Sequence, residues 1–112
     1  MIQQALVAAL AEVAGGRVFP NIAPNNVQKP YVVYARVSSS PENTLADRAP
    51  VDNTRLQVDC YDTTYAAAVG LAESVKSALA ASAITHLLLQ EQDQFEPDAL
   101  LHRVILEFSI WH

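Results

Sequence analysis

Residues 54–62, TRLQVDCYD, alternate between apolar and polar side chains. Leu56, Val58 and Cys60 fall on one side of the alternation. A period of two predicts a half-buried strand, because successive side chains of a strand point to opposite faces of the sheet. The other side is formed by an arginine, an amide, an acid and a tyrosine: Arg55, Gln57, Asp59 and Tyr61. This second face is not made of the lysine and glutamate of an ordinary solvated surface, and it raises the question of what it contacts.

Two segments place their apolar residues at the helical period of i, i+3 and i+4. The first covers residues 2–13 and should end at Gly15 and Gly16, which are typical of a helix C-terminus. The second covers about residues 64–82 and can begin with Asp62, Thr63 or Thr64 as the N-cap. Its predicted buried stripe consists of Ala68, Leu71, Ala72, Val75, Ala78 and Leu79.

Further strands are predicted at residues 17–20 (RVFP), 31–39 (YVVYARVSS), 85–92 (THLLLQEQ) and 101–112 (LHRVILEFSIWH). In the segment 31–39 we expect Tyr31, Val33 and Val37 to face the helices, so that Tyr34 and Arg36 point away, as does Val32. In the last strand Val104, Leu106, Phe108 and Ile110 form one face, and Ile105, Glu107, Ser109 and Trp111 form the other.

Two segments lack any period. Residues 39–53, SSPENTLADRAPVDN, contain Pro41 and Pro50 and predict a long loop at the end of an extended hairpin arm. Such a polar segment cannot offset its ordering entropy alone, so we expect it to be mobile in a free subunit and ordered after assembly. Residues 93–98, DQFEPD, predict an acidic turn.

The predicted order is α-β-β-β-α-β-β, in one domain spanning residues 1–112. Consecutive strands with short links favour antiparallel pairing, and two helices cannot cover both faces of such a sheet. The fold class is therefore α+β: a two-layer sandwich of a mostly antiparallel, four- to five-stranded sheet with two helices on one face.

Composition narrows the classes of function. The net charge of -5 opposes binding to phosphates, so a nucleic-acid-wrapping protein is not expected. Hydrophobic residues make up 51% of the chain and charged residues 17%, which suggests apolar area buried against a partner. The single cysteine implies no disulfide, and neither a membrane-spanning run nor a basic leader segment is found, so we expect a soluble, cytoplasmic chain.

Candidate chemistry is sparse. His86, His102 and His112 lack the close grouping of a zinc site, and Cys60 lies in the apolar register of its strand. The acids of segment 91–98 do not have the spacing of a calcium loop, and three glycines provide no phosphate-binding loop. We expect no catalytic residues, metal or cofactor.

The face that points away from the helices remains the strongest candidate site. It combines tyrosine, tryptophan and arginine, which are enriched in protein interfaces. The alternative is a partly solvated sheet face with incidental aromatic residues. The predicted subunit or partner interface consists of Tyr34, Arg36, Arg55, Gln57, Asp59, Tyr61 and Trp111.

The chain resembles the tail-terminator, or tail-completion, proteins of long-tailed bacteriophages and prophages. The similar parts are the proline-led strand PYVVYARVS, the strand RLQVDCYD running into the helix DTTYAAAVGLAESVKSAL, and the aromatic close HRVILEFSIWH. The resemblance implies a non-enzymatic virion protein with an α+β sandwich fold. It implies a hexameric ring of identical subunits on the finished tail tube. Its partners would be the major tail-tube protein and a head-completion or neck protein, with DNA only passing through and no membrane contact. The protein would lie in the host bacterial cytoplasm before assembly and in the virion tail afterwards.

Other functions remain open at this stage. A different head–tail joining or neck protein shares the same assembly logic and differs in its partner. A small dimeric ligand-binding α+β module would be favoured by a pocket with convergent polar groups. An enzyme has the least support.

Overall fold

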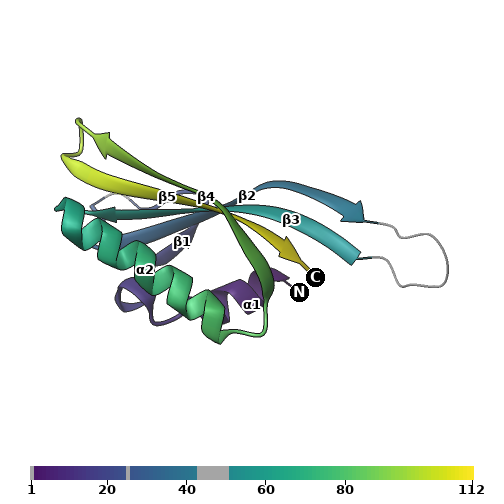
Figure 1. Cartoon of the computed structure of the whole chain (residues 1–112). Coiled ribbons are helices and arrows are strands. Elements are labelled where there is room, and N and C mark those ends of the chain that lie inside the picture. The colour runs from purple at the N-terminus through teal and green to yellow at the C-terminus, as the bar shows by residue number, and fades with distance from the viewer. Residues whose placement is uncertain (1, 25, 43–50) are drawn as a thin grey trace.

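The computed structural model describes residues 2–24, 26–42 and 51–112, and in this part of the chain five strands form one sheet with the helices on one side of it (Figure 1). The elements are α1 (Ile2–Ala9), a 3-10 turn η1 (Val13–Gly16), β1 (Val18–Pro20), β2 (Tyr31–Glu42), β3 (Val51–Asp62), α2 (Tyr65–Ala81), β4 (Thr85–Glu96) and β5 (Leu101–Trp111). The predicted order and the α+β class are confirmed.

The strand order in the sheet is β1-β2-β3-β5-β4. The pairs β2–β3, β3–β5 and β5–β4 are antiparallel, and only the short β1 lies parallel to its neighbour β2. The chain therefore leaves two outer edges: β1, which covers only part of β2, and the full length of β4.

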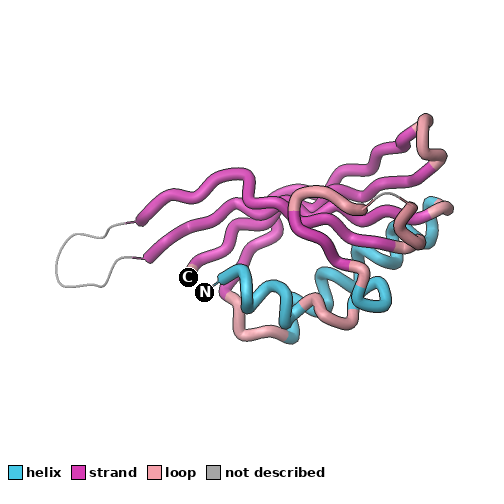
Figure 2. The backbone as a smooth tube through the Cα atoms, turned by 180° about the vertical axis from the view of Figure 1, so that it is seen from behind, coloured by secondary structure: helices cyan, strands magenta, loops and turns pink. Residues whose placement is uncertain are grey.

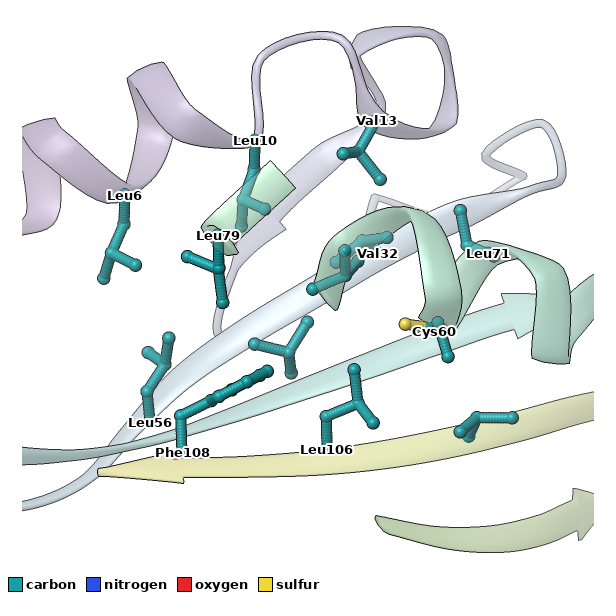
Figure 3. Packing of buried hydrophobic residues seen from close by; sticks show 14 of the residues in the cluster. Leu6, Leu10, Val13, Val32, Leu56, Cys60, Leu71, Leu79, Leu106 and Phe108 are labelled. Atoms are coloured by element: carbon teal, nitrogen blue, oxygen red, sulfur yellow. The ribbon is translucent and has the colours of Figure 1, made fainter. Parts of the chain in front are cut away.

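The core lies between the helices and the sheet. The α2 stripe is buried as predicted at Ala68, Leu71, Ala72, Val75 and Leu79, while Ala78 packs at its margin. Thr64 is the N-cap of α2, because its side-chain oxygen accepts a hydrogen bond from the Ala67 amide. Figure 3 shows Leu6, Leu10 and Leu79 directed toward sheet residues such as Leu56 and Phe108.

The first helix is shorter than predicted. The helix ends at Ala9. The backbone hydrogen bonds that follow span three residues instead of four: the Ala11 amide donates to the Ala8 carbonyl and the Val13 amide to the Leu10 carbonyl. The predicted apolar positions 6, 10 and 13 are still buried, because the tighter turns keep them on the same side.

Both segments without a period contribute residues to strands, which corrects the prediction for those residues. The ladder of β2 and β3 continues through Glu42 and Val51, so residues 39–42 and 51–53 are paired, and residues 43–50 lie outside the described part. The predicted hairpin arm is confirmed: the two strands extend past the helices (Figure 1). The ladder of β4 and β5 likewise incorporates residues 93–96, so the turn between them begins at Pro97. The residues of both extensions are mostly polar, so they show no alternation of apolar and polar positions from which a strand could be predicted.

Candidate interaction surface

We call the side of the sheet that points away from the helices the open face. The register of β3 with β5 places Arg55, Gln57, Asp59 and Tyr61 there, opposite Ser109, Glu107, Ile105 and Arg103 respectively, with Trp111 beside them opposite Asn53. The orientation predicted for these two strands is confirmed. Whether the open face contacts a partner stays a prediction.

The orientation predicted for β2 is wrong. Val32 lies opposite the core residue Cys60, Tyr34 lies opposite Val58, and Arg36 lies opposite Leu56, so all three belong to the side of the helices. Tyr34 packs against the core and Arg36 is exposed at its margin. Neither can share a surface with Arg55 in one chain.

The error has a physical cause. The segment YVVYARV is apolar in both registers, so its alternation carries no information about its faces. Val33 lies on the open face and is nevertheless buried. A bulge between Arg36 and Ser38 then shifts the phase, so that no single alternation describes the strand.

An ion-pair network occupies the centre of the open face. Arg103 donates to Asp59 with 2.7 Å between Nη2 and Oδ2, and to Glu96 with 2.9 Å between Nη1 and Oε1. Gln57 donates its amide to the same Asp59 carboxylate at 3.0 Å. Asp59 is only 6% exposed, so its charge depends on these donors. Sequence reasoning did not find Arg103, because its partners are distant in the chain.

Two tyrosines border this network. The rings of Tyr31 and Tyr61 stack with their centroids 4.7 Å apart, and the Arg103 guanidinium lies 5.6 Å from the centroid of Tyr61. Burial raises the pKa of Tyr61 to about 12 against the lowering effect of Arg103, and burial also raises the pKa of Tyr31. Both phenols therefore stay neutral at physiological pH.

The segment after β1 covers part of the open face. The Asn21 amide donates to the Tyr34 carbonyl at 2.8 Å, and Asn21, Ile22 and Ala23 line a cavity of about 430 Å³ together with residues of the network. Figure 2 shows this loop passing over the strands in the middle of the sheet. Asp59, Gln57 and the Arg103 Nη2 atom bond one another along this cavity, whereas the buried Arg103 Nε has no hydrogen-bond partner among the described residues.

The remainder of the open face is more exposed. Arg55 pairs with Glu107 at 3.2 Å, and the Arg55 side chain is 51% exposed. Asn53 donates to the Ser109 hydroxyl at 2.7 Å beside the half-buried Trp111. This region keeps the mixed arginine, acid and tryptophan composition predicted from the sequence.

Among the side chains screened for chemistry, Cys60 is buried, and Glu91 and Asp93 have structural partners. Burial raises the pKa of Cys60 to about 12, so this core thiol is not a nucleophile at neutral pH. Lys76 pairs with Glu91 at 2.9 Å, and the Tyr65 hydroxyl donates to Asp93 at 2.8 Å. No group of three or more histidine, cysteine or acidic residues suited to a metal occurs among the described residues. None of the helices in that part of the chain is long and apolar enough to cross a membrane.

Sequence reasoning also missed the outer edge of β4. Leu87, Leu88 and Leu89 are all exposed there, and no strand pairs with that edge in the described structure. Three consecutive leucines next to the run QEQDQ were the available signal.

The described residues form a two-layer α+β subunit whose open face mixes aromatic and charged side chains. The chain matches the family described as "Tail completion protein gp17" over residues 2–112. It therefore belongs to the tail completion protein family and is a structural protein of the virion tail.

Solved structures agree with this fold. A chain of the "Virion of native gene transfer agent (GTA) particle" superposes with a TM-score of 0.72 at 18% identity, covering 98% of this chain and 92% of that one. A crystal structure from Akkermansia muciniphila matches with a TM-score of 0.50 at 13% identity, covering 96% of this chain and 47% of that one. At these identities the likeness concerns the fold. No curated protein matches the chain.

Proposed function

We propose that this protein assembles as a hexameric ring on the end of the completed tail tube, stops its growth and provides the surface that joins the head. The observation that carries the proposal is the family match, which spans residues 2–112. The superposable chain of a gene transfer agent virion is consistent with it. The partners would be other copies of this chain, the major tail-tube protein and a head-completion or neck protein.

Two properties of the subunit support a ring through which DNA passes. The open face carries arginine, tyrosine and tryptophan at exposed or half-buried positions, as an assembling protein requires. The net charge of -5 gives a ring of copies a charge that repels phosphates, so that DNA slides without binding. Tight, salt-sensitive retention of DNA in a low-salt gel-shift assay would contradict this role.

The test is a tail-capping assay. Tail tubes assembled without this protein should be longer than normal and of variable length, and should lack heads. Added protein should appear by electron microscopy as a ring at one tube end, fix the length and restore head joining. Normal tube lengths without the protein, or its failure to bind tubes, would refute the proposal. Bound protein that restores head joining without limiting tube length would instead favour a neck protein.

A further inference from the structure

Both edges of the sheet offer unpaired backbone. β4 has no strand on its outer side among the described residues, and its twelve residues make it a long edge. On the opposite side β1 pairs with β2 only from Val32 to Tyr34, so within the described residues no strand pairs with the outer backbone of β2 from Ala35 onward. Such edges readily accept a strand from another chain, since their N–H and C=O groups lack partners.

The two edges carry opposite charge. Residues 13–41, which contain β1 and most of β2, include Arg17, Lys29 and Arg36 and no acid. Residues 77–102, which contain β4, include four acids and no lysine or arginine: Glu91, Asp93, Glu96 and Asp98. Glu91 and Glu96 already pair with Lys76 and Arg103, yet the edge as a whole stays negative. Edge-to-edge contact between two copies would therefore join a basic side to an acidic side.

Apolar features of the same two edges also fit each other. Where β1 ends, a cavity of about 350 Å³ opens on the helix side of the sheet, lined by Leu6, Pro20, Tyr34, Arg36 and Leu56. On β4 the three leucines lie near the beginning of the strand. Leu88 lies on the helix side, opposite Phe108, and Leu87 lies on the open face, opposite Ser109. In a sheet continued across two copies, Leu88 would lie at the mouth of this cavity, and the residues before it would run along the part of β2 from Ala35 onward in the neighbour.

Strand direction permits this contact in a ring. Three antiparallel pairings separate β2 from β4, so the two strands run in opposite directions within one chain. Rotation about an axis parallel to the strands preserves direction, so β4 of one copy would meet β2 of the next in antiparallel orientation. Because β1 occupies the outer side of β2 from Val32 to Tyr34, the acidic end of β4 then lies along β1, alongside Arg17 of the neighbour.

We propose that copies of this protein join head to tail through the β4 edge of one subunit and the β1–β2 edge of the next, with Leu87, Leu88 and Leu89 as the apolar contact. The inference rests on the proposed ring and identifies its subunit interface. Two different patches on opposite edges form a heterologous contact, which closes into a ring when the rotation permits.

The test uses three variants of the full chain in the presence and absence of tail tubes. The first, Leu87→Lys/Leu89→Lys, alters only the β4 edge, and the second, Arg36→Glu/Val37→Asp, alters only the β2 edge. Val7→Lys is the matched control, because Val7 is 51% exposed on α1 and Leu87 is 55% exposed. Each edge variant should lose rings at least tenfold by mass photometry while the control assembles like the parent.

Mixing the two edge variants gives the sharper result. A head-to-tail contact leaves one intact joint between them, so the mixture should form heterodimers and no closed ring. Rings formed by either edge variant alone would overturn the inference and leave the proposed function intact. A parent protein that forms no ring even on tail tubes would refute both.

Hydrogen exchange on the unmodified protein tests the same contact without depending on variants that could misfold. The β4 amides that point outward should exchange at least tenfold more slowly in the ring than in the monomer. Unchanged exchange along β4 in a ring would also overturn the assignment.

Discussion

Replacing Arg103 by methionine should destabilise the fold through Asp59. The guanidinium is the cation beside this carboxylate, at 2.7 Å, and the Asp59 side chain is 9% exposed. Breaking a buried ion pair by removing one partner costs about 3–5 kcal/mol, because the other charge is left without compensation. The Arg103 side chain is 22% exposed, so water can replace part of the lost contact and we expect about 3 kcal/mol.

This loss converts into a change of melting temperature. An unfolding entropy of about 2.1 cal/mol/K per residue gives about 0.24 kcal/mol/K for a chain of this length, so Arg103→Met should lower Tm by about 13 °C. The control is Arg55→Met, which removes an exposed pair with Glu107. A surface pair contributes about 0.5 kcal/mol, so the control should lower Tm by about 2 °C.

Calorimetry of a double variant separates charge from packing. The double variant Asp59→Leu/Arg103→Met removes both charges and should recover most of the lost stability. The reasoning is refuted if Arg103→Met melts within about 3 °C of the parent, or if the double variant is no more stable than the single one.

The other predictions concern assembly, capping and ionisation. Arg55→Glu should weaken capping of tail tubes at least tenfold with Tm nearly unchanged, because Arg55 lies on the open face. Tyr34→Ala should cost about 2 kcal/mol of folding stability, because Tyr34 packs against the core; unfolding curves and tail-capping yields of both variants check this. Thr64→Ala should cost about 1 kcal/mol by removal of the α2 N-cap, measured by urea unfolding, with no change in ring yield. The Tyr61 phenol should ionise near pH 12 in the folded protein, and the stability that its neutral form contributes below its unfolded pKa should be lost as pH rises from about 10 to 12, which absorbance titration and unfolding at each pH can follow.

The sequence predicted the parts of the fold in which burial is one-sided. Residues 54–62 and 101–112 alternate because a helix layer covers one face only, and both orientations are confirmed. The α2 stripe followed from the helical period, and the structure selects Thr64 as the N-cap from the three candidates at residues 62–64. For Tyr31 to Val37 the predicted orientation was wrong. The loop at Asn21 covers part of the second face of this strand, so apolar residues occur on both of its faces and their alternation does not identify the core side.

The candidate site was predictable only where single strands define it. The alternation within each strand is enough to predict which residues share the open face: Arg55, Gln57, Asp59, Tyr61 and Trp111. Two features need the tertiary structure. The pairing of Arg103 with Asp59 spans 44 residues of sequence, and the open edge of β4 depends on a strand order that no local pattern encodes.

The hairpin arm has a consequence for how the free subunit moves in solution. The molecule measures 52 × 23 × 23 Å, and its radius of gyration is 14.9 Å, whereas a compact chain of this length has about 13 Å. An elongated particle meets more friction than a sphere of equal mass, so a monomer should diffuse slowly and elute early from a sizing column. The monomer then resembles a small oligomer by elution volume, and sedimentation combined with mass measurement is the appropriate way to distinguish one subunit from two.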